Sequence, residues 1–299
     1  MRKIKNDFTA LCLLTQEELK TYLHEQLSTY YTDIHNKDGF LYCAGDAPIM
    51  LTAHLDTVHR EHVKTIRFSR GCISSPQGIG GDDRAGVFAI LHALPDMERL
   101  PHLLFCEDEE TGCIGSRKFT RSGIRPDIRH IVGLDRKGNN DAVFYDCGNA
   151  EYKDYILALT GFKEASGSFT DICELSPYLD VASVNLSVGY YDQHTTQERV
   201  NLREMVYTSS LLPLLVADSY NQPRYTYDEI APTFYGYTWH DTLSDPNVTE
   251  WEIYALPKKG KPVYDTVLAS DYVRAVGLFL MEHPHLRYND VQYCDNLWR

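Results

Sequence analysis

The sequence lacks the features that mark membrane-spanning or nucleic-acid-binding proteins. Basic residues are few: 29 Lys and Arg stand against 42 Asp and Glu, for a net charge of −13. That balance argues against nonspecific binding of nucleic acid, which requires a basic surface. Long apolar runs are also missing, since the longest, around residues 211–217, is far too short to cross a bilayer. We therefore expect no nucleic-acid partner and no membrane span.

Signatures of secretion and of cysteine-based sites are missing as well. The N-terminus is basic but lacks the apolar core and cleavage site of a secretory signal. No two cysteines show the Cys-x-x-Cys spacing of metal or redox motifs. We expect reduced thiols in a cytoplasmic protein. The eight cysteines are Cys12, Cys43, Cys72, Cys106, Cys113, Cys147, Cys173 and Cys294.

The chain does contain enough apolar residues for a sizeable core. Of its 299 residues, 43% are hydrophobic and 24% are charged, which suffices for one core, or for one core plus an appendage. We expect a single catalytic domain over 1–299, with its core at about 15–220. Residues 221–264, rich in Tyr and Pro, predict an irregular extension, and about 265–283 predict a helix that packs back on the core.

Strand-like and helix-like segments alternate along the core. Thr15 and Glu18 form a capping-box pattern that predicts a first helix at about 15–29. The alternation predicts an α/β fold, a three-layer αβα sandwich with a central, mostly parallel mixed sheet. In such folds ligands bind beyond the carboxyl ends of the strands. Strands are predicted at 40–43, 49–53, 102–106, 131–134, 142–145 and 181–188, and further helices at 87–94, 112–120, 149–159 and 197–218.

A histidine and an aspartate follow the predicted strand at 49–53. His54 and Asp56 lie on the same side of the chain, because side chains alternate along a strand. The aspartate can therefore orient the imidazole, an arrangement that metal-binding histidines usually have. Taken alone, His-x-Asp is more often an isolated histidine beside a solvated aspartate.

Two adjacent carboxylates, Asp82 and Asp83, follow a glycine-rich stretch at the start of a predicted helix. They repel each other unless a cation neutralises one of them. A helix-capping aspartate beside a flexible loop is the simpler alternative. A phosphate-binding loop is rejected, because two carboxylates there would repel phosphate.

Four acids follow the strand at 102–106, and they end with Glu109 and Glu110. They are either a solvated charge run or a group that cations stabilise. Since adjacent side chains point in different directions, one glutamate can bind a cation while its neighbour acts as a base. Asp135, at the end of the strand at 131–134, means little alone.

The last segment is His194, between the strand at 181–188 and the following helix. The full order His-x-Asp, Asp-Asp, Glu-Glu-x-Gly-x-x-Gly, Asp, His resembles the co-catalytic di-zinc exopeptidases. That superfamily of aminopeptidases and carboxypeptidases includes peptidase T. The resemblance covers residues from about 50 to 200, roughly half of the chain.

The resemblance implies a set of metal ligands. Asp82 would bridge two zinc ions, with His54 and Asp135 on one ion and Glu110 and His194 on the other. A set of imidazoles and carboxylates suits Zn²⁺, although Co²⁺ or Mn²⁺ can occupy the same ligands. The expected cofactor is therefore a pair of Zn²⁺ ions.

The resemblance also implies catalytic roles. Glu109 resembles the general base that deprotonates the water between the metals, and Asp56 resembles the residue that orients His54. The Asp82–Asp83 peptide bond would be cis. Two metals would lower the pKa of a bound water and stabilise the oxyanion, and Glu109 would carry the proton to the leaving amine.

The spacing of the last two ligands indicates which branch of the superfamily the chain resembles. Many members insert a dimerisation lid domain between them, but Asp135 and His194 are only 59 residues apart, so we expect the compact branch without a lid. Substrate contacts would then come from loops or from a partner subunit. Thr170 and Asp171, in the segment 167–171, are candidates, as is the segment 221–264.

The expected function is zinc-dependent hydrolysis of peptide bonds, with an aminopeptidase as the first choice. The alternatives are an N-acyl-amino-acid deacylase that uses the same di-metal site and a non-catalytic binding protein of the same fold. A mono-metal transferase of the glutaminyl-cyclase type would not need both pairs of ligands. The expected partner is a peptide or N-acyl amino acid substrate, and assembly into a homo-oligomer is left open.

Overall fold

The computed structural model describes residues 1–145, 147–167, 169–228, 249–257, 261–269 and 290–296, together with 275, 276, 279, 280, 283 and 286. The chain divides into two compact units, Met1–Glu229 and Ile230–Arg299. This differs from the single domain expected over 1–299, because the C-terminal segment forms a unit of its own.

An eight-stranded mixed sheet forms the centre of the first unit. Its strands are β1 (Ile34–Lys37), β2 (Phe40–Cys43), β3 (Ala47–His54), β6 (Pro101–Cys106), β7 (His130–Arg136), β8 (Asp141–Val143), β9 (Lys163–Ala165) and β10 (Ser183–Ser187). They are ordered β1-β2-β6-β3-β7-β10-β8-β9. The central strands β6, β3, β7 and β10 are parallel to one another, so their carboxyl ends meet at one edge of the sheet.

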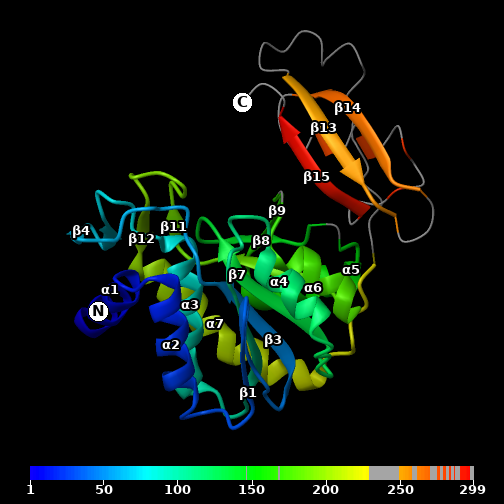
Figure 1. The fold of residues 1–299 in the computed structure, drawn as a ribbon. Coiled ribbons are helices and arrows are strands. Elements are labelled where there is room, and N and C mark those ends of the chain that lie inside the picture. Colours follow the sequence, from blue (N-terminus) through cyan, green and yellow to red (C-terminus); the bar gives the residue numbers. More distant parts are fainter. Residues whose placement is uncertain are drawn as a thin grey trace. The chain divides into compact units, whose positions relative to one another are not determined.

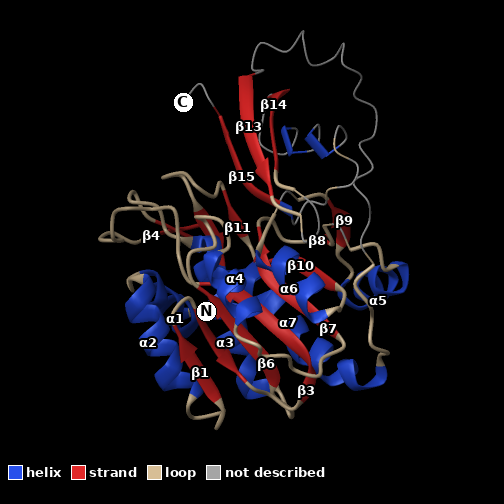
Figure 2. Ribbon diagram, turned by 45° about the vertical axis from the view of Figure 1, so that its right-hand side comes forward, coloured by secondary structure: helices blue, strands red, loops and turns tan. Residues whose placement is uncertain are grey.

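Helices cover both faces of this sheet, as Figures 1 and 2 show. Successive residues of β3 point to opposite faces of the sheet. Leu51 packs with the helices of one face, and Met50 packs with those of the other. This confirms the predicted αβα sandwich. One face carries α1 (Arg2–Cys12), α2 (Gln16–Leu27), α3 (Gly81–Ala93), α5 (Ala150–Thr160) and α7 (Leu202–Asp218), and the other carries α4 (Ile114–Arg121) and α6 (Asp171–Leu179).

The capping box predicted from Thr15 and Glu18 is confirmed. Thr15 Oγ1 accepts a hydrogen bond from the Glu18 amide at 3.1 Å, and a Glu18 carboxylate oxygen accepts one from the Thr15 amide at 2.9 Å. These two bonds satisfy amide groups that the first turn of α2 leaves without helical partners.

The first unit also contains a small antiparallel sheet with the strand order β11-β12-β5-β4. It consists of β4 (Arg67–Ser69), β5 (Cys72–Ser74), β11 (Tyr190–Tyr191) and β12 (Arg199–Asn201). The helix predicted at 197–218 therefore begins later, at Leu202, because the preceding three residues pair with β5. Asn201 caps it by accepting the Arg203 amide. The β11–β12 connection carries His194.

The second unit contains the antiparallel sheet β14-β13-β15, made of β13 (Thr249–Ala255), β14 (Val263–Ala269) and β15 (Val291–Asn296). The helix predicted over about 265–283 is wrong at its start, since 265–269 belong to β14. The described residues of its later part, 275–276 and 279–280, are helical. Val267 packs there with Ile253 and Phe279 in a separate apolar cluster.

Part of the predicted irregular extension over 221–264, the residues 229–248 and 258–260, lies outside the described residues. Its last part, from Thr249 to Ala255, is β13 rather than irregular chain. Its residues alternate between Trp251, Ile253 and Ala255 on one side and polar neighbours on the other, which is the two-residue period of a strand. Among the described helices, none is both long and apolar enough to cross a membrane.

Candidate metal centre

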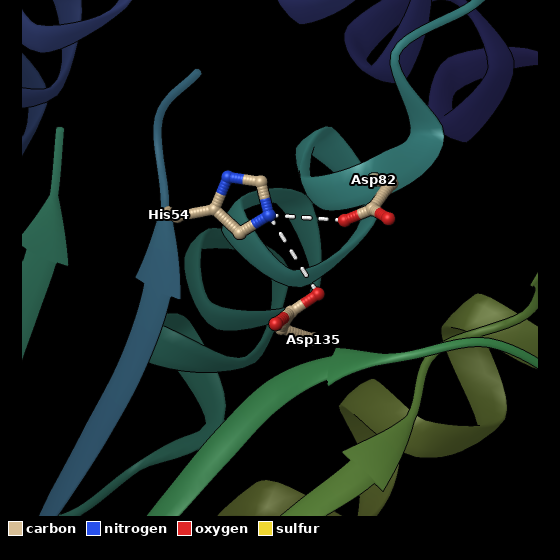
Figure 3. A group of neighbouring side chains, drawn as sticks. All are labelled: His54, Asp82 and Asp135. Carbon is tan, nitrogen blue, oxygen red and sulfur yellow. Dashed lines mark hydrogen bonds and ion pairs between the residues drawn. The ribbon is translucent and has the colours of Figure 1, made fainter. Parts of the chain in front are cut away.

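Three of the predicted ligands meet at the carboxyl edge of the large sheet. His54 is the last residue of β3, Asp135 lies near the end of β7, and Asp82 lies in the first turn of α3. Figure 3 shows one ring nitrogen of His54 directed at both carboxylates. This nitrogen, Nε2, lies 2.9 Å from Asp82 Oδ1 and 3.6 Å from Asp135 Oδ1.

A second group forms around the other oxygen of Asp82. His194 Nε2 lies 3.3 Å from Asp82 Oδ2 and 3.0 Å from Glu110 Oε1. His194 comes from the β11–β12 loop, where its backbone is left-handed with φ of 62°. Its side chain is 51% exposed, whereas that of His54 is 1% exposed. One group is thus enclosed, and the other is open to solvent.

Asp82 belongs to both groups, and in each group the ligand atoms lie within 4.8 Å of one another. The two groups contain the ligands that the resemblance assigns to the two ions: His54, Asp82 and Asp135 for one, and Asp82, Glu110 and His194 for the other. The structure brings these five side chains together. Their function as metal ligands stays a prediction.

The charges of this cluster favour a cation. Burial lowers the pKa of His54, but hydrogen bonds to Asp135, Asp56 and Asp82 outweigh it and raise that pKa well above its usual value. Contacts with Asp82 and Glu110 raise the pKa of His194 to about 10. The carboxylates thus outnumber the positive charges available to them and hold protons on both imidazoles. Divalent cations bound to these oxygen and nitrogen atoms would supply the same charge.

Asp56 supports the cluster from behind. Its carboxylate lies 3.1 Å from Nδ1 of His54, on the ring nitrogen that does not face Asp82. The same carboxylate accepts the backbone amides of Glu109 at 2.9 Å and Glu110 at 3.0 Å. Asp56 therefore sets the position of one histidine and of the loop that carries both glutamates.

Asp83 faces away from the two groups and has a structural role. It is fully buried, and its carboxylate accepts the amides of His54 at 3.2 Å and Gly86 at 2.8 Å. These bonds join the end of β3 to the first turn of α3. The Asp82–Asp83 peptide bond is cis, as the resemblance implies.

Glu109 lies in the loop after β6, where Asp56 accepts its backbone amide, and its role as a base stays a prediction. Burial raises the pKa of its carboxyl to about 9, and the charges of Asp135, Asp171 and Glu110 add to this effect while His54 opposes it. The Cys113 thiol lies 3.7 Å from Oε1 of Glu109. A buried carboxyl of this kind binds a proton readily, and neighbouring positive charge would release it.

Asp135 is held by three side chains, of which only Thr170 is predicted from the sequence, and that as a candidate substrate contact. Tyr190 donates a hydrogen bond to Oδ1 at 3.1 Å, and Thr170 donates one to Oδ2 at 2.8 Å. The side chain of Asn185 bonds both the amide and the carbonyl of Asp135, each at 2.7 Å. An asparagine inside an apolar strand is a signal in the sequence, because a buried amide needs partners. Tyr190 has no such signal.

The two residues predicted to contact substrate lie at the start of α6. Thr170 and Asp171 are buried, at 3% and 4% exposure. The hydroxyl of Thr170 donates a hydrogen bond to Asp135, and burial raises the pKa of Asp171 to about 6. The segment 167–171 is therefore not a free surface loop where it is described. A contact of these two side chains with substrate stays a prediction.

Several solved structures that match the fold of this chain are peptidases by name. Aminopeptidase PepT from Bacillus cereus matches with a TM-score of 0.60 and 16% identity, over 73% of this chain and 98% of its own. A tripeptidase from Staphylococcus aureus matches with a TM-score of 0.61 and 15% identity, over 74% and 99%. The chain has an aminopeptidase fold. No protein-family model and no curated protein matches the chain.

The TET1 peptidase of Pyrococcus horikoshii shares this aminopeptidase fold, with a TM-score of 0.54 and 14% identity over 72% of this chain and 98% of its own. Between Asp135 and His194, the described residues form β8, α5, β9, α6, β10 and β11, all within the first unit. The aminopeptidase fold of this chain is thus compact at that point, as the short spacing predicts.

Proposed function

We propose that the protein is a metal-dependent hydrolase of peptide bonds, and specifically an aminopeptidase with two Zn²⁺ ions. The observation that carries this proposal is the sharing of Asp82: one oxygen lies beside His54, and the other lies beside His194. A carboxylate between two ligand groups is what a pair of ions needs. The aminopeptidase fold supports the choice of substrate class.

The residues have separate tasks in this proposal. His54 and Asp135 would hold one ion, Glu110 and His194 the other, and Asp82 both. When bound, the ions would polarise the scissile carbonyl and acidify a water molecule. Glu109 would accept the proton of that water and deliver it to the leaving amine. Asp56 keeps Nε2 of His54 directed at Asp82.

The deciding experiment combines metal analysis with substrate screening. The purified chain is expected to bind about two ions and to release the N-terminal residue of short peptides or aminoacyl-arylamides. Glu109→Gln should keep the metal but lose roughly 100- to 10,000-fold in kcat, the usual contribution of general base catalysis. Fewer than one bound ion, or full turnover by Glu109→Gln, contradicts the proposal.

The same screen separates the alternatives. Cleavage of N-acyl amino acids alone would assign the protein as a deacylase, because both reactions need the same ligands and base. Metal binding without turnover of any amide would favour a binding protein of the same fold.

A homo-oligomer is the proposed assembly. The TET1 peptidase of Pyrococcus horikoshii is described as assembling into a tetrahedron or a large octahedral shell. Because the segment between Asp135 and His194 has no room for a lid, a neighbouring subunit is the natural source of walls around the open ligand group. Light scattering on the purified protein tests this, and a mass of about 34 kDa would contradict it.

A further inference from the structure

One buried carboxylate beside the two ligand groups has no part in the chemistry proposed above. Glu198 lies four residues after His194, directly before β12, and its side chain is fully buried. Burial of a carboxylate is unfavourable unless hydrogen bonds or opposite charges compensate it. The partners of Glu198 therefore indicate what it does.

The two oxygens of Glu198 accept three hydrogen bonds. Oε1 accepts the amide of Asp82 at 2.9 Å, and Oε2 accepts the amide of Gly80 at 2.8 Å. His59 Nε2 lies 2.8 Å from Oε2. Because a carboxylate can only accept, this nitrogen of His59 carries the proton. Bonds of this kind are roughly twice as strong as those between neutral groups.

These bonds hold the irregular start of α3. Gly80 is left-handed with φ of 64°, and Asp82 and Asp83 after it have non-helical backbone angles. Glu198 accepts the amides of Gly80 and Asp82 from positions 118 and 116 residues further along the chain. The first turn of α3, which carries Asp82, is thus held from outside the helix.

The glycine-rich loop before α3 is also enclosed by side chains. A Cβ atom on Gly78 would lie 2.2 Å from the ring of His59, and one on Gly81 would lie 2.4 Å from Val200. His59 and β12 therefore confine the loop, while Glu198 bonds its amides. The backbone of Asp82 has little freedom to move.

Glu198 also closes the loop that carries His194. Its amide donates to the carbonyl of Thr195 at 3.1 Å, and the Thr195 hydroxyl donates to the carbonyl of Asp192 at 2.7 Å. An ion pair between Asp192 and Arg199 joins the two ends of the loop. One residue thus links the backbone of Asp82 to the segment that positions His194.

We propose that Glu198 is a positioning residue, braced by His59, that fixes Asp82 relative to the His194 loop so that both ligand groups share one carboxylate. This inference rests on the proposed two-ion site. It predicts that the link between Glu198 and the Gly80–Asp82 backbone matters more than the charge of Glu198 alone.

A matched pair of variants tests the proposal. Glu198→Gln keeps the size of the side chain but puts an amide group against one of its donors. Glu204→Gln makes the same change at a residue that bonds Tyr191 and Asn139 instead. In the protein without metal, the amides of Gly80 and Asp82 should exchange hydrogen about tenfold faster or more in Glu198→Gln, and at the wild-type rate in Glu204→Gln.

Titration with Co²⁺, followed by its visible absorption, provides the second measurement. Glu198→Gln should bind at least one ion about 10- to 100-fold more weakly, with kcat reduced and KM little changed. His59→Gln, which keeps a donor, should bind Co²⁺ more tightly than His59→Phe. If Glu198→Gln does not fold, the comparison of the two His59 variants tests the proposal in its place.

Wild-type amide exchange and Co²⁺ affinity in Glu198→Gln would overturn the inference. Failure of the proposed function looks different. If the wild type binds less than one ion, the two-ion proposal is lost, while the exchange rates still decide whether Glu198 holds the Gly80–Asp82 backbone.

Discussion

The Asp56 carboxylate accepts a hydrogen bond from Nδ1 of His54 at 3.1 Å, on the side of the ring that does not face Asp82. Since the carboxylate accepts, Nδ1 keeps its proton, and a bound cation would replace the proton on Nε2. Asp82 and Asp135 lie on that Nε2 side.

Replacement of Asp56 should therefore weaken metal binding. In Asp56→Asn an amide group would face either His54 or the amides of Glu109 and Glu110. We expect a 10- to 100-fold loss of metal affinity, roughly the effect of removing such supporting bonds in other metal sites. Equilibrium dialysis measures this, with the exposed Asp154→Asn as control. Equal affinity in the two variants would contradict the role of Asp56.

Removal of the two histidines should have unequal effects on stability. His194→Ala removes a half-exposed side chain and should lower the melting temperature without metal less than His54→Ala, which removes a buried one. Each variant should keep about one ion of the two proposed. Mass spectrometry for metal content and calorimetry without metal check this. Two ions in either variant would remove that histidine from the ligand set.

Low pH should destabilise the protein, because the folded state keeps His130 neutral. Burial among aromatic rings, together with the charge of Arg129, lowers the pKa of His130 to about 3, and its Nε2 has no hydrogen-bond partner among the described residues. The folded protein keeps this histidine neutral, while the unfolded chain takes up a proton below about pH 6.5. Stability is thus unaffected above that pH and falls as the pH decreases towards 3.

The variant His130→Leu cannot take up this proton. Between pH 7 and pH 5 the wild type should lose about 2 kcal/mol more free energy of unfolding than His130→Leu. Urea denaturation at the two pH values provides the measurement. The exposed His92→Leu is the control and should follow the wild type. Parallel losses in His130→Leu and the wild type would show that His130 is not kept neutral.

Gly86 joins the start of α3 to the end of β7 and should not tolerate a side chain. A Cβ atom there would lie 2.1 Å from the carbonyl oxygen of Leu134 and 2.5 Å from Oδ1 of Asp83. Gly86→Ala should cost about 3 kcal/mol of stability, the upper end of the usual range for overpacking. Gly123→Ala, at a positive φ but in open space, should cost only about 1 kcal/mol. Thermal denaturation compares them, and equal losses would mean that backbone conformation alone accounts for the effect.

The position of several site residues follows from local patterns in the sequence. His54 and Asp56 are two apart after a strand, so they lie on the same side. Asp135 ends a strand parallel to β3, so both reach the same edge of the sheet. Thr15 and Glu18 define a helix start through contacts three residues apart. Each of these relationships depends only on the spacing of residues along the chain or on the shared direction of parallel strands.

Other features depend on contacts between distant segments. The segment around Thr170 has the composition of a loop, yet Thr170 is buried directly before α6 and its hydroxyl bonds Asp135, 35 residues earlier. The sequence continues from Leu268 to Tyr272 and Val276 at helical spacing, but residues 265–269 pair with β13 and form a strand. Neither outcome is visible in the local pattern.

The sequence by itself determined the order of the candidate ligands, the strand ends that carry them and the α/β layering, because these depend on local period and on the shared direction of parallel strands. Only the tertiary structure decided which oxygen of Asp82 faces which histidine. It also decided that Tyr190 and Thr170 hold Asp135, and that Glu198 holds the backbone of Asp82. These bonds join residues between 35 and 116 positions apart, and only the packing of buried polar groups that must find partners selects them.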